Sequence, residues 1–214
     1  GNTSTQVIIP AISPQPPYDP LKDFQAIYLM ANSPTSIVVH ESVPARTLQE
    51  LIEYARANPT KLSYGSAGAG TMTNLSGELF KQLIGVSGIT HIPYKGSAPG
   101  VADLASGHIP MMTPNIGGPL LQFHRTGKVR ILAIAAHQRL QAAPDIPTAI
   151  EAGLPGMVAA NFNGLFAPAG VPKAIVEQIA DETRRAMADP PLQELIVKSG
   201  FEPVTDSEIG RAHV

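Results

Sequence analysis

Three glycines and several hydroxyl side chains are spaced so that they could bind an anion. In the stretch LSYGSAGAGT (62–71), a short strand runs into Gly65, Gly68 and Gly70, and the helix-like sequence MTNLSGELF follows. Glycine lets the backbone take positive φ and approach a ligand closely. The N–H groups at the start of a helix attract negative charge. The stretch therefore predicts a site for a small anion, although similar glycine patterns occur in many loops.

The same loop lacks the residues that three other chemistries need. A nucleophile elbow needs glycine two residues before its serine, but Tyr64 precedes Ser66 at that spacing. A phosphate-binding P-loop needs lysine after the last glycine, and a dinucleotide fold needs Gly-x-Gly-x-x-Gly; neither is present. The sequence implies no histidine partner for Ser66. We expect no catalytic residue, with a hydrolase that uses the Ser66 loop as the alternative.

Other titratable residues offer little chemistry. The six histidines show neither i,i+4 pairing nor a neighbouring carboxylate motif, so we expect no metal ion and no cofactor. Glu78 and Asp103 fall on separate predicted helices and are expected to be solvated. Tyr94 and Lys95 follow a predicted strand and could line a cleft, although a plain surface position is slightly favoured for Lys95.

The composition describes an ordered globular chain. Of the 214 residues 43% are hydrophobic and 15% are charged, which argues against disorder. A formal net charge of −2 gives no reason to expect nucleic acid as a partner. Cysteine is absent, which excludes disulfides and thiol chemistry, and no apolar run approaches the length of a membrane span. Because no initiator Met or signal peptide is present, and Asp206–Glu208 resembles a helix start close to the end, we expect a fragment truncated at both ends.

Strands and helices are predicted to alternate. The expected strands are 24–31, 36–40, 62–66, 89–93, 109–113, 129–136 and 164–167. This alternation predicts an α/β fold with a mainly parallel sheet, in which ligands bind at the carboxyl ends of strands. Three polar or glycine-rich turns are expected there: an N-terminal loop at 2–5, the loop at 65–71 and the turn at 115–118. The sequence NFNG (161–164) places an aromatic residue between amides, just before a strand.

Three helices carry specific expectations. Thr47 and Glu50 match a capping box at a helix start. The helix after the glycine loop is expected to bury Leu75, Leu79 and Leu83, together with Phe80 and Ile84. A long helix that begins at Pro172 is expected to turn Ile175, Ile179 and Met187 inward.

Several motifs in a fixed order resemble the solute receptors of tripartite tricarboxylate transporters. They are YDPLKDF (18–24), YGSAGAGT (64–71), GELF (77–80), HIPYKGSAP (91–99), PDIPT (144–148), EAGLPG (151–156) and GLFAPAGVP (164–172). The resemblance covers residues 1 to about 205. Several ordered motifs together are more specific than any one of them.

The resemblance implies a two-lobed, periplasmic-binding-protein type II-like fold with an incomplete first lobe. Lobe 1 would comprise 1–34 and 161–214, and lobe 2 would be 35–160. The protein would be a bacterial periplasmic receptor that closes on a small di- or tricarboxylate and passes it to membrane permease subunits. It would be a monomer without nucleic-acid partners, and its signal peptide is not part of this chain.

The resemblance also implies which residues bind the ligand. One carboxylate would be capped by the glycine loop, through Ser66, Ala67, Gly68, Gly70 and Thr71. From the other lobe, Asn2, Thr3 and Ser4 would face the ligand, and Asn115 and Phe162 are weaker candidates.

This sequence also departs from the family pattern. Asn74 stands where the family usually has histidine, Phe162 where it has tryptophan, and the family's first strand with its loop is absent. The receptor hypothesis predicts binding without turnover. An enzyme would need an acid–base pair that the sequence does not offer, and a receptor fragment that does not bind is a third possibility.

Overall fold

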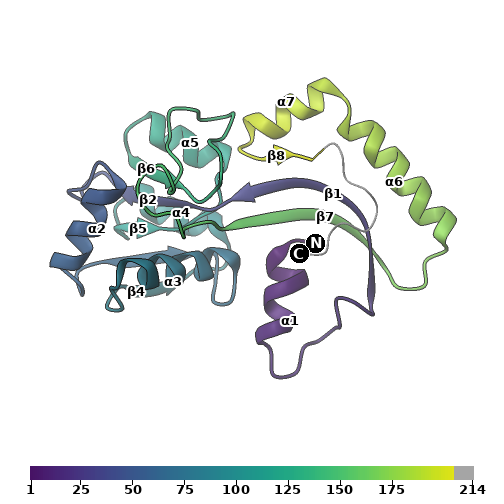
Figure 1. Cartoon of the computed structure of the whole chain (residues 1–214), viewed down its shortest axis with the longest axis horizontal. Helices are drawn as coiled ribbons and strands as arrows, with labels where there is room; N and C mark the ends of the chain where they lie inside the picture. The colour runs from purple at the N-terminus through teal and green to yellow at the C-terminus, as the bar shows by residue number, and fades with distance from the viewer. Residues whose placement is uncertain (205–214) are drawn as a thin grey trace. The chain divides into compact units, whose positions relative to one another are not determined.

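The computed structural model describes residues 1–204, which divide into two compact units (Figure 1). The first unit combines Gly1–Ser33 with the segment from Asn161 onward, and the second is the continuous stretch Pro34–Ala160. That these units act as receptor lobes remains a prediction. Within the described part of the chain, no helix is both long and apolar enough to cross a bilayer. The helix start expected at Asp206–Glu208 lies outside the described residues.

The second unit is built on a five-stranded sheet in the order β4-β3-β5-β2-β6. Its strands are β2 (Ser36–His40), β3 (Ser63–Ser66), β4 (Thr90–Pro93), β5 (Met111–Met112) and β6 (Val129–Ile134). Strand β3 pairs in parallel with β4 and β5, whereas β2 pairs antiparallel with β5 and β6. The sheet is therefore mixed, and the expectation of a mainly parallel sheet was wrong. Hydrophobic patterning locates strands but does not say which strands become neighbours.

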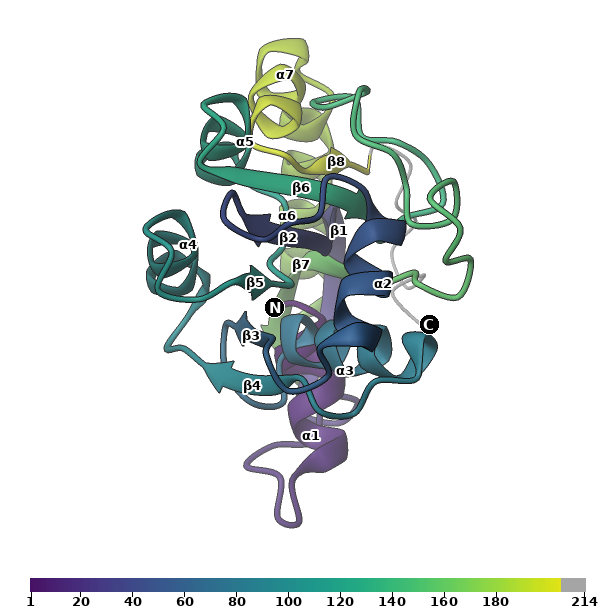
Figure 2. The same ribbon diagram turned by 90° about the vertical axis from the view of Figure 1, so that its left-hand side faces the viewer.

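Helices cover both faces of this sheet (Figure 2). They are α2 (Leu48–Ala57), α3 (Met72–Ile84), α4 (Ser97–Ala105) and α5 (Gly118–Arg125). Successive residues of a strand point to opposite faces, so Val39 packs in the cluster with α2 and α3, while Val38 packs with Leu104 of α4 and Leu121 of α5. The result is an α/β unit in which a buried sheet separates two apolar cores.

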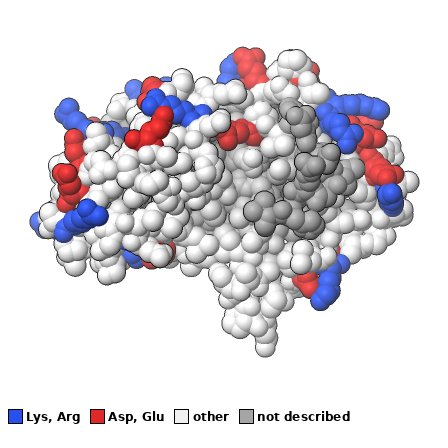
Figure 3. All heavy atoms as spheres, viewed as in Figure 1, with Lys and Arg blue, Asp and Glu red and all other residues white. Residues whose placement is uncertain are grey.

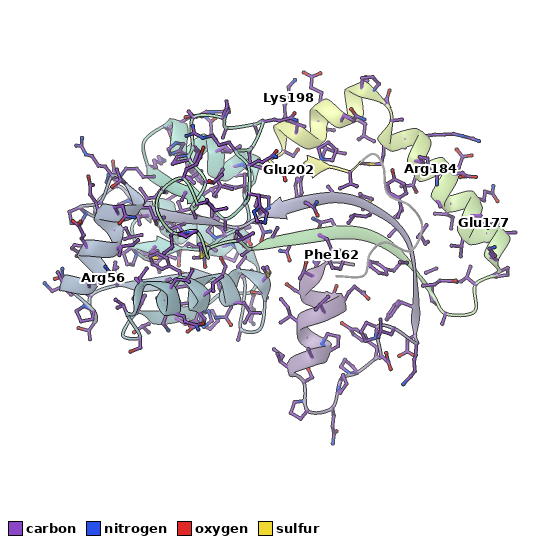
Figure 4. The ribbon with its side chains drawn as sticks, viewed as in Figure 1. Arg56, Phe162, Glu177, Arg184, Lys198 and Glu202 are labelled. Carbon is purple, nitrogen blue, oxygen red and sulfur yellow. The ribbon has the colours of Figure 1, made fainter. Side chains whose placement is uncertain are left out.

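Helix α2 begins as its sequence predicts. The N–H of Glu50 donates to Thr47 Oγ1 at 3.2 Å, and Glu50 Oε2 accepts from the N–H of Arg46 at 2.6 Å. The capping box is thus confirmed, with the return bond one residue earlier than the motif usually makes it. At the other end, Arg56 (Figure 4) donates from Nε to the Ile84 carbonyl at 3.1 Å, which joins the last turns of α2 and α3.

Helix α3 buries only part of the face expected: Phe80 and Ile84 are buried and Leu79 is partly buried, as predicted, but the other two leucines are not. Leu75 and Leu83 are 41% and 36% exposed, whereas Ser76 and Gly77 are buried. A Cβ on Gly77 would lie 2.1 Å from Cε2 of Tyr64, so the tyrosine ring of β3 occupies the space beside this glycine. Small residues are required there because the ring lies so close to the helix. Hydrophobic periodicity is read from large apolar residues, so it does not reveal that a small residue is needed at this contact.

The first unit contains a three-stranded sheet in the order β7-β1-β8. Its strands and long helices are β1 (Phe24–Pro34), β7 (Ala160–Pro168), β8 (Glu202–Pro203), α6 (Lys173–Met187) and α7 (Pro190–Lys198). On the solvent side of α6, Lys173 pairs with Glu177 and Arg184 with Asp181, and Figure 3 shows positive and negative side chains interspersed there. Phe162 lies within β7, not just before a strand as the sequence suggested.

Helix α6 also presents a different stripe to its core. Val176, Ala180 and Met187 are buried, whereas Ile175 and Ile179 are 47% and 39% exposed. Of the three expected inward residues, only Met187 is correct. The buried stripe joins a cluster with residues of β1 and β7, and the small Ala180 is fully buried in it. The two stripes are adjacent on the helix, so the sequence alone could not choose between them.

The chain begins with a helix where the sequence suggested a polar loop. A π-helical turn (Ser4–Ile8) continues into α1 (Ile9–Ile12). The N–H of Asn2 donates to Thr5 Oγ1 at 3.0 Å, and the N–H of Thr5 donates to Asn2 Oδ1 at 3.1 Å. This segment is rich in β-branched residues and contains a proline, which both lower helix propensity, and the helix was therefore missed.

Candidate functional site

The glycine loop that joins β3 to α3 is closed by hydrogen bonds to its own side chains. Three backbone amides donate to flanking side-chain oxygens: Ala67 N to Thr73 Oγ1 (2.9 Å), Gly68 N to Ser66 Oγ (3.1 Å) and Gly70 N to Asn74 Oδ1 (3.0 Å). The sequence predicts that these same amide N–H groups bind an anion. The loop is consequently held in shape by its own residues, and Ser66 is completely buried beneath it.

Two of the glycines are required by backbone geometry. Gly68 has φ +138° and Gly70 has φ +72°, values that L residues rarely adopt. Thr71 then begins the helix, because its Oγ1 accepts from the N–H of Asn74 at 3.3 Å and donates to the Gly68 carbonyl at 2.7 Å. Thr71 is thus the N-cap of α3. The exposed Ala69 lies between the two glycines at the tip of the loop.

Ser66 has a histidine partner that the sequence analysis did not find. His91 Nε2 lies 2.7 Å from Ser66 Oγ. The parallel register pairs Tyr64 with His91, so both residues and Ser66 point to the same face of the sheet. The expectation that Ser66 lacks a histidine was wrong. Two consecutive predicted strands joined by a crossover helix usually lie next to each other, which makes the neighbourhood of these strands predictable but not the register that places His91 opposite Tyr64.

Around His91 the polar side chains form one network. The rings of Tyr64 and His91 stack, with centroids 4.9 Å apart and planes 23° from parallel. Asn74 Nδ2 donates to the Tyr64 hydroxyl at 2.8 Å and lies 3.5 Å from His91 Nδ1. The Tyr64 hydroxyl in turn donates to Glu78 Oε1 at 2.7 Å. Glu78 is therefore part of a network and not simply solvated as expected.

The network changes the pKa values of its members. Burial lowers the pKa of His91, and the nearby carboxylate of Glu78 only partly opposes this. Burial alone would raise the pKa of Glu78, but hydrogen bonds from Lys81 and Tyr64 outweigh it and leave the pKa below its usual value. Burial and the hydrogen bond to Glu78 raise the pKa of Tyr64. At neutral pH the network thus holds a neutral histidine beside an ionised glutamate.

Three loops meet at the carboxyl ends of β3, β4 and β5. The N–H groups of Tyr94 and Gly96 donate to the carbonyls of Ser66 and Ala67, at 3.0 and 2.9 Å, respectively. Between them, Lys95 is exposed and makes no ion pair with any residue in the range 1–204.

The third loop follows β5 and reaches the start of α3. Thr113 Oγ1 donates to the carbonyl of Thr73 at 2.7 Å. Asn115, two residues further on, forms an isolated antiparallel bridge with Thr35. The predicted residues Ser66, Ala67, Gly68, Gly70 and Thr71 therefore lie together, with the Asn115 loop attached to the same helix start.

In the first unit, the other predicted residues lie together at the start of the chain. The N–H of Phe162 donates to Thr3 Oγ1 at 2.9 Å, and Asn2 forms an antiparallel bridge with Asn163 (Figure 4 labels Phe162). Ser4 follows directly as the first residue of the π-helical turn. The hydroxyl of Thr3 and the side chain of Asn2 are thus engaged in fixing the helix start against β7.

Two buried polar atoms belong to residues at this helix start: Gln6 lies in the π-helical turn, and Asn163 forms the bridge with Asn2. Gln6 Oε1 and Asn163 Nδ2 are buried and have no hydrogen-bond partner among the described residues. Buried polar atoms are nearly always hydrogen-bonded, so each such exception calls for an explanation.

As for metal binding, residues 1–204 contain no cluster of three or more histidine or acidic side chains that could hold an ion.

Comparison with known proteins gives a consistent result. A family model described as the tripartite tricarboxylate transporter family receptor matches residues 2–212. A curated protein of Pseudomonas sp. strain P51, named for the tcbD-tcbE intergenic region, is 34% identical over 202 residues, which is 94% of this chain and 60% of that protein. The chain thus spans less than two thirds of the length of this relative.

Two solved structures with bound ligands are similar along almost the whole chain. An R. palustris protein solved with adipate is 32% identical, with a TM-score of 0.89, over 95% of this chain and 67% of that one. MatC from Rhodopseudomonas palustris, solved with bound malate, is 30% identical, with a TM-score of 0.85, over 99% of this chain and 69% of that one. Both ligands are dicarboxylates.

Proposed function

The chain belongs to the tripartite tricarboxylate transporter receptor family, and on this premise we propose that it binds a small organic carboxylate for such a transporter. The adipate and malate bound by two relatives support a dicarboxylate or similar acid as the ligand. The protein would act in the periplasm as a monomer and deliver its ligand to membrane permease subunits, without turnover.

The observation that carries this proposal is the glycine loop at the start of α3. An ionised carboxylate there would meet the positive end of the helix dipole. The hydrogen bonds from the Ala67 and Gly70 N–H groups to Thr73 Oγ1 and Asn74 Oδ1 hold the loop in the shape that would receive it. We propose that Ala67, Gly68, Gly70 and Thr71 contact the carboxylate. The buried Ser66 would act through the shape of the loop.

The remaining predicted residues contribute to the proposal more weakly. Asn115 lies on a loop bonded to the start of α3. In the first unit, Asn2, Thr3, Ser4 and Phe162 gather at one helix start. We propose them as further polar and aromatic contacts, and single alanine variants of Asn115 and Phe162 would separate their contributions.

Thermal unfolding with a ligand panel tests the function directly. The panel is malate, succinate, adipate, citrate and benzoate at pH 7.5, with adipamide as the uncharged counterpart of adipate. A ligand that binds only the folded state raises the midpoint in proportion to its saturation. We expect one class of carboxylate to raise the midpoint, adipamide to leave it unchanged, and the ligand to be recovered intact. A flat response to all five acids would contradict the proposal for this chain.

Lys95 provides a sharper test of where the anion binds. The exposed Lys95 lies on the loop whose Gly96 N–H donates to the Ala67 carbonyl, so Lys95→Gln removes a positive charge from the loop next to the proposed site. We expect about threefold weaker binding of the best acid by calorimetry, as is typical for one solvated charge. Lys61→Gln, an exposed lysine before β3, is the matched control and should bind like the parent. Equal affinities of the two variants would show that the anion does not bind at this loop.

A hydrolase is the second candidate, because Ser66 and His91 lie 2.7 Å apart. Nucleophile activation requires the histidine nitrogen to accept the serine proton. The complete burial of Ser66 argues against attack on a substrate, and so does the Asn74 amide that faces His91 Nδ1 where a catalytic triad has a carboxylate. Incubation with p-nitrophenyl acetate distinguishes the two functions: we expect the same slow release from the parent and from Ser66→Ala, whereas loss of activity in the variant would establish the enzyme.

A further inference from the structure

The hydrogen bonds around Asn74 indicate which nitrogen of His91 carries its proton. The N–H of Gly70 donates to the Asn74 side chain, so the atom that accepts is Oδ1 and the other terminal atom is the donor Nδ2. Nδ2 faces the Tyr64 hydroxyl at 2.8 Å and His91 Nδ1 at 3.5 Å. Because a donor faces Nδ1, the neutral ring is favoured with its proton on Nε2.

The proton on Nε2 fixes the direction of the next two hydrogen bonds. Nε2–H donates to Ser66 Oγ at 2.7 Å. The single hydroxyl hydrogen of Ser66 then remains for the Gly68 carbonyl at 3.1 Å, while the Gly68 N–H donates back to Ser66 Oγ at 3.1 Å. His91 is therefore linked through one serine to both sides of the glycine with φ +138°.

We propose that the neutral His91 ring is a positioning residue that holds the glycine loop in its binding conformation, and that protonation of this ring in mild acid loosens the loop and weakens carboxylate binding. The proposal rests on the proposed function, because it assigns a control element to the same loop. No contact between His91 and the ligand is required.

Protonation would act on the loop through Asn74 and leave the bond from Nε2–H to Ser66 in place. It adds a hydrogen to Nδ1, which then faces the donor Nδ2 of Asn74, and the amide that holds the Gly70 N–H must turn away. The titratable groups that face the ring are Tyr64 on β3 and Glu78 and Lys81 on α3. Burial and Lys81 oppose the protonated ring, whereas Glu78 favours it. The net effect is that the pKa of His91 lies below the usual histidine value of 6.5.

The first test reads the proton directly in the ligand-free chain. Long-range ¹H–¹⁵N spectra distinguish the two neutral tautomers of a histidine. We expect His91 to show the Nε2–H tautomer at pH 7.5, and the Nδ1–H tautomer would overturn the proposal. In the same samples, the Gly68 and Gly70 amide signals should titrate between pH 7.5 and 5.5 in the parent and stay constant in His91→Gln. Glycine signals that titrate equally in both proteins would also overturn it.

The second test measures binding with malate and adipate as probes. His91→Gln keeps a donor near Nε2 but cannot titrate, His91→Leu removes the donor, and the exposed His137→Gln is the control. At pH 7.5 we expect His91→Gln within about threefold of the parent and His91→Leu about tenfold weaker, the effect of one lost hydrogen bond.

The pH dependence separates positioning from mere support of the fold. Between pH 7.5 and 5.5, binding should weaken in the parent and in His137→Gln, while His91→Gln shows only the change caused by protonation of the acid itself. A pH slope in His91→Gln equal to that of the parent would contradict the proposal. If the parent binds none of the five acids of the panel, the proposed function fails, and the ligand-free spectra alone decide whether His91 positions the loop.

Discussion

The pKa shift of His91 links this residue to the stability of the whole chain. Its pKa is lowered in the folded protein by burial, so the unfolded chain binds the proton more readily. Its contribution to stability is therefore complete above the unfolded pKa near 6.5 and decreases as the pH falls from there to the folded pKa.

Urea unfolding checks this linkage. We expect the free energy of unfolding of the parent to fall more between pH 7.5 and 5.5 than that of His91→Gln, since only the parent carries this titration. His137→Gln should follow the parent. Identical pH profiles of the parent and His91→Gln would show that the pKa of His91 is the same in both states.

At the level of single residues, the sequence predicted the backbone of the glycine loop better than the side-chain hydrogen bonds around it. Glycine is the residue type that most readily adopts positive φ, and Gly68 and Gly70 do so. Threonine is common at helix N-caps, and Thr71 is the N-cap of α3. The link from Ser66 to His91 spans 25 positions and depends on the register of two parallel strands. Nothing in the local sequence specifies that register, so the network could not be read from it.

At the level of elements, the contact between α3 and β3 depends on the missing side chain of Gly77. In Gly77→Ala, the Cβ would lie 2.1–2.6 Å from ring atoms of Tyr64, a ring held by stacking and by hydrogen bonds. We expect this variant to lose about 3 kcal/mol of unfolding free energy through overpacking, despite its gain in helix propensity.

Gly100→Ala in α4 is the matched control for this prediction. Its Cβ would lie 2.7 Å from Cε of Met112, the end of a flexible side chain that can move aside, and 3.1 Å from Cδ2 of Tyr94, which has to shift by only a few tenths of an ångström. We expect a change within about 1 kcal/mol in the same chemical denaturation experiment, because the helix-propensity gain offsets the repacking. A loss as large as that of Gly77→Ala would mean that neither core tolerates an added methyl group.

The N-cap of α2 gives a second prediction at this scale. Thr47→Ala removes the oxygen that accepts from the N–H of Glu50, and we expect a loss of about 1 kcal/mol. Thr47→Ser keeps the hydroxyl and should retain most of that stability. If both variants lose the same amount, the methyl group of Thr47 matters and the cap does not.

Helices and strands were predicted well where a few neighbouring residues determine them. They were predicted poorly where packing against another strand or helix determines which residues are buried. The capping box of α2 and the strand at 36–40 are complete within a few residues. The buried faces of α3 and α6 depend on which strand residues they meet, such as Tyr64 for α3. The antiparallel pairing of β2 likewise depends on strand order, which hydrophobic periodicity does not contain.

At the level of the whole molecule, the second unit is continuous in sequence and has its own cores. Both faces of its sheet are covered by its own helices. We therefore expect residues 34–160, expressed alone, to unfold cooperatively with urea and to show dispersed NMR signals. A linear, non-cooperative transition would show that this stretch requires the first unit to fold.

The interrupted first unit has a consequence for synthesis. Strand β1 lies between β7 and β8, yet both neighbours follow more than a hundred positions later. At about 5–20 residues per second, β1 leaves the ribosome on the order of ten seconds before β7 does. Throughout that interval, both edges of a nascent strand are available for pairing with other chains, so a holding chaperone would have time to bind this segment.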